Sequence, residues 1–295
     1  MGEPLLYWDR AAGRLATERV YGEAWLHWAY GTSPGRRALR ALVGPGFSRL
    51  YGYYQSSRLS ARKVPAFIEK FGIAMHEYDG APFASFNDFF IRRFKPGARR
   101  FAAAASDFPA FAESRLLAFE KISPDQIFPV KAAGLSAEKI LGGELKARPF
   151  IGGPLLLARL CPVDYHRFHY PDDGETLESY ELAGPLHSVN PAALAFNGDI
   201  LATNHRRVSL LKTRHFGLLA YVEVGALCVG KIAQTHPEAQ PFNRGEEKGY
   251  FLFGGSTVIV FGEPGAWSPD DDLLKQTALG HETLVRLGER IAQAL

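Results

Sequence analysis

The segment Phe253-Gly254-Gly255-Ser256-Thr257-Val258-Ile259-Val260 places two glycines and a serine directly before a β-branched run. The run predicts a buried strand, and the glycines predict a turn that leads into it. Most Gly-Gly-Ser sequences are simple turns. Glycine also permits a strained backbone, which could bring the hydroxyl of Ser256 to the carbonyl of Gly255.

Attack of the Ser256 hydroxyl on the Gly255 carbonyl would move the acyl group from nitrogen to oxygen. β-Elimination of the ester would then cut the chain, and the dehydroalanine left behind would hydrolyse to a pyruvoyl group. The segment therefore allows two interpretations, a turn before a strand or a self-cleavage site between Gly255 and Ser256.

Short apolar runs separated by Gly and Pro recur throughout the second part of the chain. They occupy residues 115–119, 155–160, 218–224, 251–253, 257–261 and 283–287. This texture predicts an α+β fold with a β-rich body that resembles a barrel or a sandwich. We place the boundary after the alanine run 102–105, which gives a helical region at 1–106 and a β-rich catalytic domain at 107–295.

The N-terminal region is basic, and residues 17–72 show helical spacing of apolar side chains. Residues 1–106 contain sixteen Lys and Arg against eight Asp and Glu, a balance of +8, so the remainder carries −5 of the net +3. Aromatic and basic residues are interleaved here: Trp25, Trp28, Tyr51, Tyr54, Arg36, Arg37, Arg40 and Arg49. The pattern fits amphipathic helices on an anionic membrane, or a helical lid packed on the protein's own core.

Composition narrows the classes of protein. The chain has 295 residues and is 46% apolar, which suffices for one globular core. No run reaches the 18 apolar residues of a membrane span, and the N-terminus lacks a signal pattern, so we expect a soluble or peripheral protein. Cys161 and Cys228 are the only cysteines, which argues against a disulfide framework.

A second cluster places Asp164, His166 and His169 within six residues. The two histidines could contribute to a metal site, but no third ligand is obvious, and we expect no metal. They could instead transfer protons near neutral pH, or they could be hydrogen-bonded histidines in a loop.

Taken together, five segments in chain order resemble the phosphatidylserine decarboxylase family. Phe86-Asn87-Asp88-Phe89-Phe90, with Lys95-Pro96-Gly97-Ala98-Arg99, is similar to its FNDFF…LKPGARP segment, and residues 164–171 are similar to its DYHRxHxP signature. His187-Ser188-Val189-Asn190-Pro191 resembles YSVNP, residues 204–230 follow NERV…FG…VGA…VG, and residues 245–259 resemble the self-cleavage segment KGxExGxFxFGGSTVI.

The resemblance implies a function and a set of site residues. Cleavage between Gly255 and Ser256 would give a β chain of residues 1–255 and an α chain of residues 256–295, with Ser256 as the precursor of a covalent pyruvoyl cofactor. That cofactor would form a Schiff base with phosphatidylserine, which loses CO₂ and becomes phosphatidylethanolamine. His169 would be the base for cleavage, and His166 would serve decarboxylation.

The remaining site residues also come from the resemblance. Glu113 stands where the family has an aspartate and would orient His169, while Phe111 replaces a family proline. His187, Ser188 and Val189 would bind the substrate.

The implied partners are phosphatidylserine and an anionic membrane surface. We expect a peripheral protein on the cytoplasmic face of a bacterial inner membrane, a possible homodimer, and no role for nucleic acid. Two alternatives are an unprocessed, non-catalytic membrane-binding relative and a serine hydrolase that uses Ser256 with His169.

Overall fold

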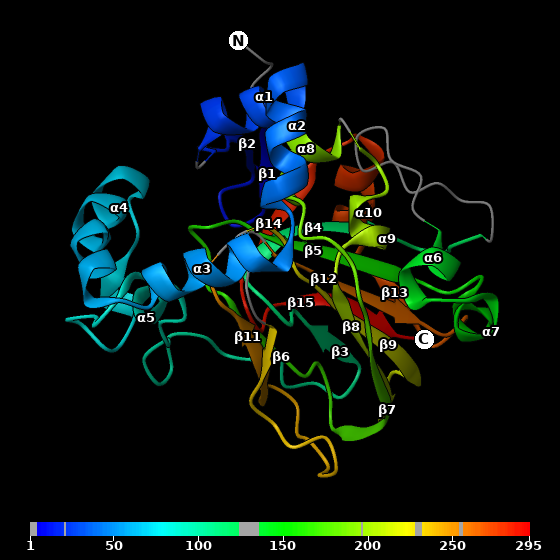
Figure 1. Ribbon diagram of the computed structural model, residues 1–295. Helices are drawn as coiled ribbons and strands as arrows, with labels where there is room; N and C mark the ends of the chain where they lie inside the picture. The colour runs from blue at the N-terminus through cyan, green and yellow to red at the C-terminus, as the bar shows by residue number, and fades with distance from the viewer. Residues whose placement is uncertain (1–4, 21, 124–135, 196, 228–231, 254–255) are drawn as a thin grey trace.

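The protein is a mixed α/β structure built on one large sheet (Figure 1). The computed structural model describes residues 5–20, 22–123, 136–195, 197–227, 232–253 and 256–295. The large sheet has nine strands in the order β2-β1-β14-β4-β5-β12-β9-β8-β7. Every neighbouring pair is antiparallel except β1 with β14, which is parallel.

The strands of the large sheet coincide with most of the apolar runs of the sequence. In sheet order they are β2 (Arg14–Thr17), β1 (Leu6–Asp9), β14 (Glu282–Val285), β4 (Ser114–Phe119), β5 (Leu155–Leu160), β12 (Ser256–Gly262), β9 (Leu218–Val224), β8 (Arg206–Thr213) and β7 (Gly174–Leu182). The sheet is open, because β2 and β7 form its two opposite edges. The prediction of a mixed helix and strand fold with a β-rich body is confirmed, but the large sheet in the described residues does not close into a barrel.

Two small sheets share the core of the large one. The first has the order β10 (Ile232–Gln234), β11 (Glu247–Phe251), β6 (Arg167–His169), and the second has the order β13 (Trp267–Pro269), β15 (Arg290–Ala294), β3 (Asp107–Pro109). A single hydrophobic cluster contains buried residues from all three sheets, among them Phe168, Val258 and Ile291. The alternation of apolar residues in the sequence does not predict the separation into three sheets, because each strand of the two small sheets is only three to five residues long.

Helices occupy much of residues 23–71, in agreement with the helical spacing of that region. They are α1 (Glu23–Gly31), α2 (Ser33–Leu42), α3 (Pro45–Gln55), the 3-10 helix Arg58–Lys63 and α4 (Val64–Phe71). Thr32 starts α2 by accepting a hydrogen bond from the Gly35 amide at 3.0 Å, and α4 ends at Gly72 with a φ of +64°. Figure 1 shows α3 and α4 projecting to one side of the large sheet.

The remaining helices are short. They are α5 (Phe86–Phe90), α6 (Ala137–Leu141), α7 (Glu144–Ala147), α8 (Pro191–Leu194), α9 (Ile200–Thr203), α10 (Asp271–Ala278) and the 3-10 helices Met75–Glu77 and Arg148–Phe150. No helix in the described ranges combines the length and the apolar character that a bilayer span requires.

The N-terminal residues are not helical throughout. Residues 6–17 form the hairpin β1–β2, and β1 pairs in parallel with β14 near the C-terminus. The Arg10 guanidinium reinforces this junction by ion pairs to Asp270 at 2.9 Å and Asp272 at 2.7 Å. The first strands of the chain are thus part of the main sheet, and the division at residue 106 stays a prediction.

Candidate active site

Ser256 is the first residue of β12, a central strand of the large sheet. β12 pairs with β5 on one side and with β9 on the other, and Ser256 lies opposite Leu160, the last residue of β5. Because β5 ends there, the turn that follows it passes directly beside Ser256. The serine side chain is fully buried. Gly255 lies outside the described residues.

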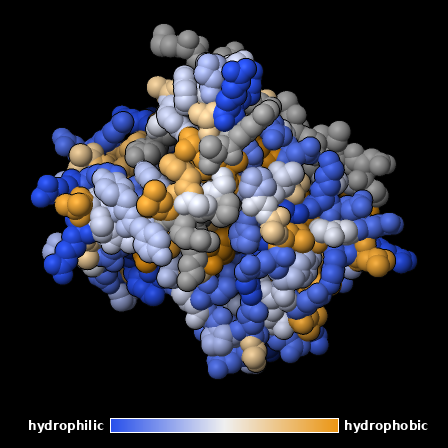
Figure 2. All heavy atoms as spheres, in the orientation of Figure 1, coloured by the Kyte–Doolittle hydropathy of each residue, from blue (hydrophilic) through white to orange (hydrophobic). Residues whose placement is uncertain are grey.

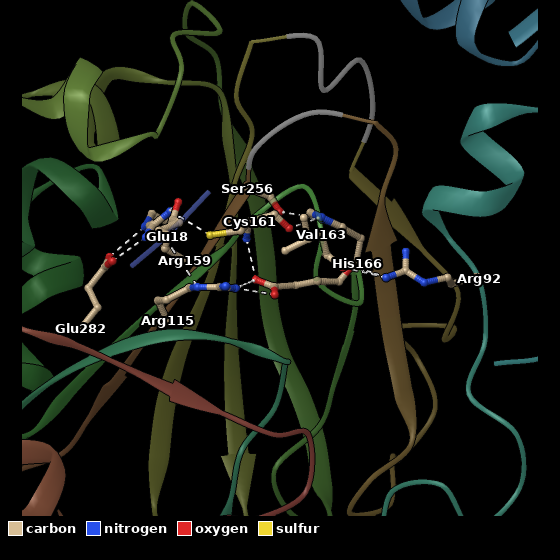
Figure 3. Close-up of polar contacts among 10 residues, drawn as sticks. Glu18, Arg92, Arg115, Arg159, Cys161, Val163, His166, Ser256 and Glu282 are labelled. Atoms are coloured by element: carbon tan, nitrogen blue, oxygen red, sulfur yellow. Dashed lines mark hydrogen bonds and ion pairs between the residues drawn. The ribbon is translucent and has the colours of Figure 1, made fainter. Parts of the chain in front are cut away.

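His166 contacts the serine. Its Nδ1 lies 3.3 Å from Ser256 Oγ, and its Nε2 lies 2.9 Å from the Cys161 carbonyl oxygen (Figure 3). A carbonyl can only accept a hydrogen bond, so Nε2 carries the proton and Nδ1 presents its lone pair to the serine hydroxyl. Burial lowers the pKa of His166 to about 3, and the nearby Arg92 guanidinium adds to that shift. The imidazole is therefore neutral at pH 7 and can accept a proton from Ser256.

The turn that carries His166 is held by a buried ion pair. The Arg115 guanidinium pairs with the Asp164 carboxylate, which also accepts the Cys161 amide at 2.7 Å. The Asp164 amide donates to the Cys161 carbonyl at 2.8 Å, the same oxygen that bonds His166. The ion pair thus fixes the carbonyl that sets the tautomer of His166.

Helix α5 covers the other side of His166. The Phe90 ring stacks on the imidazole with centroids 3.8 Å apart. Arg92 follows the helix and donates to the Val163 carbonyl at 2.8 Å and to the Asp164 carbonyl at 3.1 Å. The FNDFF segment, which the sequence did not connect with the histidines, is therefore packed directly against one of them.

His169 lies at the end of β6 and has different neighbours. Its Nδ1 is 2.9 Å from the Gly245 carbonyl, so Nδ1 carries the proton, and its Nε2 is 3.4 Å from the Tyr165 hydroxyl. Burial lowers its pKa to about 4. Among the described residues, no hydrogen bond or ion pair joins His169 to Ser256. The structure thus brings His166, rather than His169, to the serine.

Glu113 is bound to other groups. Its carboxylate pairs with Arg99 and accepts a long hydrogen bond of 3.4 Å from the Leu287 amide. Burial raises the pKa of Glu113 despite the adjacent guanidinium. No interaction within the described ranges joins its carboxylate to His169. The two segments are nevertheless adjacent, because the His169 amide donates to the Phe111 carbonyl at 2.8 Å.

A cavity of about 570 Å³ opens beside the site. Its wall includes Ser188 and Val189 from the predicted substrate-binding trio, together with Cys161 and Phe253 from the two segments that flank the reacting residues. His187 is not part of this wall. Its carbonyl accepts a hydrogen bond from the Asn204 side chain at 2.8 Å, which holds the trio in place. The rest of the wall includes apolar side chains of α1, α2 and α3, and three charged residues, Glu18, Lys70 and Arg159.

A buried ionic cluster next to the site was missed in the sequence. Arg159 pairs with Glu18 at 2.6 Å and with Glu282, and its guanidinium also contacts Cys161 Sγ at 2.9 Å (Figure 3). Burial alone would raise the pKa of Glu18, but Arg159 and Arg115 outweigh it and lower the pKa to about 2. The only signal in the sequence was Arg159 within an otherwise apolar run. Its partners are 141 and 123 residues away.

No group of three or more His, Cys, Asp or Glu in the described parts of the chain is arranged to hold a metal ion.

Comparison with known proteins shows the family to which this chain belongs. The sequence model of the phosphatidylserine decarboxylase family matches residues 86–293. The phosphatidylserine decarboxylase proenzyme of Desulfitobacterium hafniense is 38% identical over 288 residues, covering 97% of each chain. The proenzyme of Clostridium novyi is 40% identical over 281 residues, covering 94% of this chain and 95% of the relative.

The chain belongs to the phosphatidylserine decarboxylase family. These relatives are named proenzymes.

Proposed function

We propose that this protein is a self-processing decarboxylase of phosphatidylserine, with Ser256 as the precursor of its pyruvoyl group. The observation that carries the proposal is the contact between Ser256 Oγ and the unprotonated Nδ1 of a neutral His166. A serine fully buried at the start of a central strand has no surface role, whereas next to a proton acceptor it can become a nucleophile.

The self-cleavage requires only groups of the chain itself and one water molecule. Ser256 Oγ attacks the Gly255 carbonyl, the peptide C–N bond breaks, and an ester forms. Loss of the Ser256 α-proton then expels the Gly255 carboxylate and leaves dehydroalanine. Its hydrolysis releases ammonia and gives the pyruvoyl group.

The residues around position 256 fit such a group. They combine a buried position, a neutral imidazole and an adjoining cavity large enough for part of a phospholipid. When bound there, the pyruvoyl group supplies the electron sink for the loss of carbon dioxide from the serine headgroup. His166 would hold or deliver a proton at this position, while Ser188 and Val189 would bind the substrate at the cavity wall.

The base for self-cleavage is a separate proposal. The family resemblance assigns it to His169, whose Nε2 carries a lone pair because Nδ1 donates to Gly245. Glu113, on the segment beside His169, would orient it once its carboxylate leaves Arg99. His166 is the competing candidate because it already contacts Ser256. Variants of the two histidines distinguish these candidates.

The helices near the N-terminus would bind an anionic bilayer. Large apolar side chains there are exposed: Trp25, Trp28, Leu50, Tyr53, Tyr54 and Leu59. Arg36, Arg37 and Arg58 are exposed in the same region. Figure 2 shows apolar patches interspersed with hydrophilic ones over the face that carries these helices. Aromatic and basic residues together suit the headgroup level of a membrane, here the cytoplasmic face of a bacterial inner membrane.

Denaturing mass spectrometry tests the function. Purified protein should give two chains, residues 1–255 and a 40-residue fragment that begins at former Ser256 with a ketone that reacts with borohydride. Ser256→Ala should stay one chain and form no phosphatidylethanolamine from phosphatidylserine. A wild-type protein that stays uncut would support the non-catalytic relative. Labelling of intact Ser256 by a fluorophosphonate would support the serine hydrolase.

Binding to lipid has its own test. Co-sedimentation with liposomes should rise with phosphatidylglycerol content and fall with salt, since each base near the surface contributes about 1 kcal/mol. Binding that is indifferent to both would refute the membrane proposal. The predicted homodimer is tested by light scattering of the same preparation.

A further inference from the structure

Asn87 is a buried polar residue that connects helix α5 to the segment before the proposed cleavage site. Its side chain is only 4% exposed. Its Oδ1 accepts the Phe253 amide at 2.9 Å, and its Nδ2 donates to Ser56 Oγ at 2.9 Å. Phe253 is followed in the sequence by Gly254, Gly255 and then Ser256.

We propose that Asn87 is a positioning residue for self-cleavage: it anchors the upstream end of the Gly-Gly linker, so that the scissile carbonyl meets the hydroxyl of Ser256. This inference rests on the proposed function and extends it to a residue that takes no part in the chemistry.

The linker needs an anchor at each end. Downstream, Ser256 and Thr257 are held by strand pairing to Leu160 and Val224. Upstream, Phe253 lies beyond the end of β11 at Phe251, so a side chain holds its amide in place of a strand partner. The two glycines between the anchors have no side chains to pack, and glycine has the largest conformational freedom of any residue. The two anchors therefore fix Phe253 and Ser256, the residues on either side of the two glycines.

The Phe253 ring reinforces the upstream anchor. It packs against Phe86 and Phe90 of α5, with centroids 4.9 and 5.0 Å away, and against Tyr51 of α3 at 6.0 Å. These apolar contacts are not directional, whereas the hydrogen bond to Asn87 fixes the position of the Phe253 backbone amide. Asn87 therefore adds a positional constraint that the aromatic cluster does not.

The same helix also positions a histidine. Phe90 stacks on His166, three residues after Asn87 in the chain. One short helix thus contacts both the segment that is cut and the imidazole beside the nucleophile. A displacement of about 1 Å between reacting groups can cost on the order of a hundredfold in rate, so loss of one contact should be visible in the cleavage rate.

The experiment measures cleavage of freshly translated precursor, followed on gels by the appearance of the 40-residue fragment. Asn87→Leu removes the acceptor and keeps the branched shape of the side chain, and Asn87→Ala removes it without adding bulk. Asn87→Asp keeps an acceptor for the Phe253 amide. Ser56→Ala removes only the second partner of Asn87. Asp88→Asn is the matched control, because Asp88 is an exposed neighbour on the same helix whose side chain accepts the Ala84 amide. Melting of each variant in a Ser256→Ala background identifies those that fold.

We expect folded Asn87→Leu or Asn87→Ala to cut about a hundredfold more slowly than the wild type. Asn87→Asp should cut within about tenfold, and Ser56→Ala and Asp88→Asn within about threefold. Wild-type cleavage by either acceptor-free variant would overturn the inference. So would Ser56→Ala slowing as much as Asn87→Leu, because the Phe253 contact would then not be the cause. Cleavage of the wild-type precursor tests the proposed function, and the rates of the variants relative to the wild type test the role of Asn87.

Discussion

The two histidines of the segment 164–170 have different neighbours. Both imidazoles are buried, both are neutral, and each donates one N–H to a backbone carbonyl. His166 presents its free nitrogen to Ser256, whereas His169 presents it to the Tyr165 hydroxyl. Burial and charge state are therefore shared, whereas the tautomers differ: Nε2 carries the proton in His166, and Nδ1 carries it in His169. The position relative to β12 also separates them.

The difference shows how one short segment can provide two proton acceptors with separate tasks. His166 sits in the turn that follows β5, and this turn is fixed by Asp164 and Arg115. His169 sits in β6, which pairs with β11 in a different sheet. Because the two imidazoles are hydrogen-bonded to different carbonyls, those of Cys161 and Gly245, substitution of one should leave the other in place, and single variants can separate their roles.

The largest expected effect is on cleavage in His169→Ala. As the proposed base, His169 should contribute towards the upper end of the 10²–10⁴-fold range of general-base catalysis, so the precursor should stay largely uncut. Pulse-chase labelling and gels measure this. Tyr165→Phe is the control, since it removes the 3.4 Å contact to Nε2 but keeps the imidazole. If His169→Ala cuts normally while His166→Ala does not, the histidine that contacts Ser256 is the base.

His166→Ala should affect the second reaction. The variant should be cut at least in part. Its mature form should lose about 10²–10³-fold in kcat for decarboxylation, because no imidazole remains beside residue 256 to transfer a proton. The rate is followed by release of labelled CO₂ and is normalised to the pyruvoyl content. Full activity per pyruvoyl group would remove His166 from the proton-transfer step.

Asp164→Asn tests whether the ion pair holds the His166 turn. The variant leaves the buried Arg115 guanidinium with only its longer ion pair to Glu18, at 3.7 Å, and should destabilise the protein by about 3 kcal/mol. Denaturant unfolding of the uncut Ser256→Ala protein measures this. Glu178→Gln is the matched control, because the Glu178–Lys146 pair is largely exposed and should contribute less than about 1 kcal/mol. Equal effects of the two substitutions would contradict a positioning role for Asp164.

The smallest expected effect is the pH dependence of stability. The folded pKa values of His166 and His169, about 3 and about 4, lie below the unfolded value of about 6.5. Below pH 6.5 the unfolded state therefore binds protons first, and each histidine lowers the free energy of unfolding by about 1.4 kcal/mol per pH unit until its folded pKa is reached. Above pH 6.5 neither contributes.

Comparison of a histidine variant with its parent protein measures the contribution of one histidine to this pH effect. His166→Asn in the Ser256→Ala background should lose less stability between pH 7 and pH 5 than the parent, by about 2 kcal/mol. Denaturant unfolding at the two pH values measures this, and contributions from other groups cancel in the comparison. An unchanged pH dependence would show that His166 is not buried in its neutral form.

The sequence by itself predicted the central strands of the large sheet and the segments that carry the chemistry, but not β1, β2, β7 or β8. The runs 155–160, 218–224 and 257–261 lie within β5, β9 and β12, because continuous apolar runs of that length, rich in β-branched residues and leucine, are typical of strands buried on both faces of a sheet. Family membership also followed from short motifs in chain order.

Only the tertiary structure decided which of these segments meet. The open sheet, rather than a barrel, depends on strand order, which apolar alternation does not encode. The choice of His166 over His169 as the neighbour of Ser256 depends on β5 ending opposite the start of β12. Glu113 has Arg99 as its partner, and Asn87 has Phe253, a residue 166 positions away. Contacts at that separation arise from the packing of whole elements, so no local pattern in the sequence can predict them.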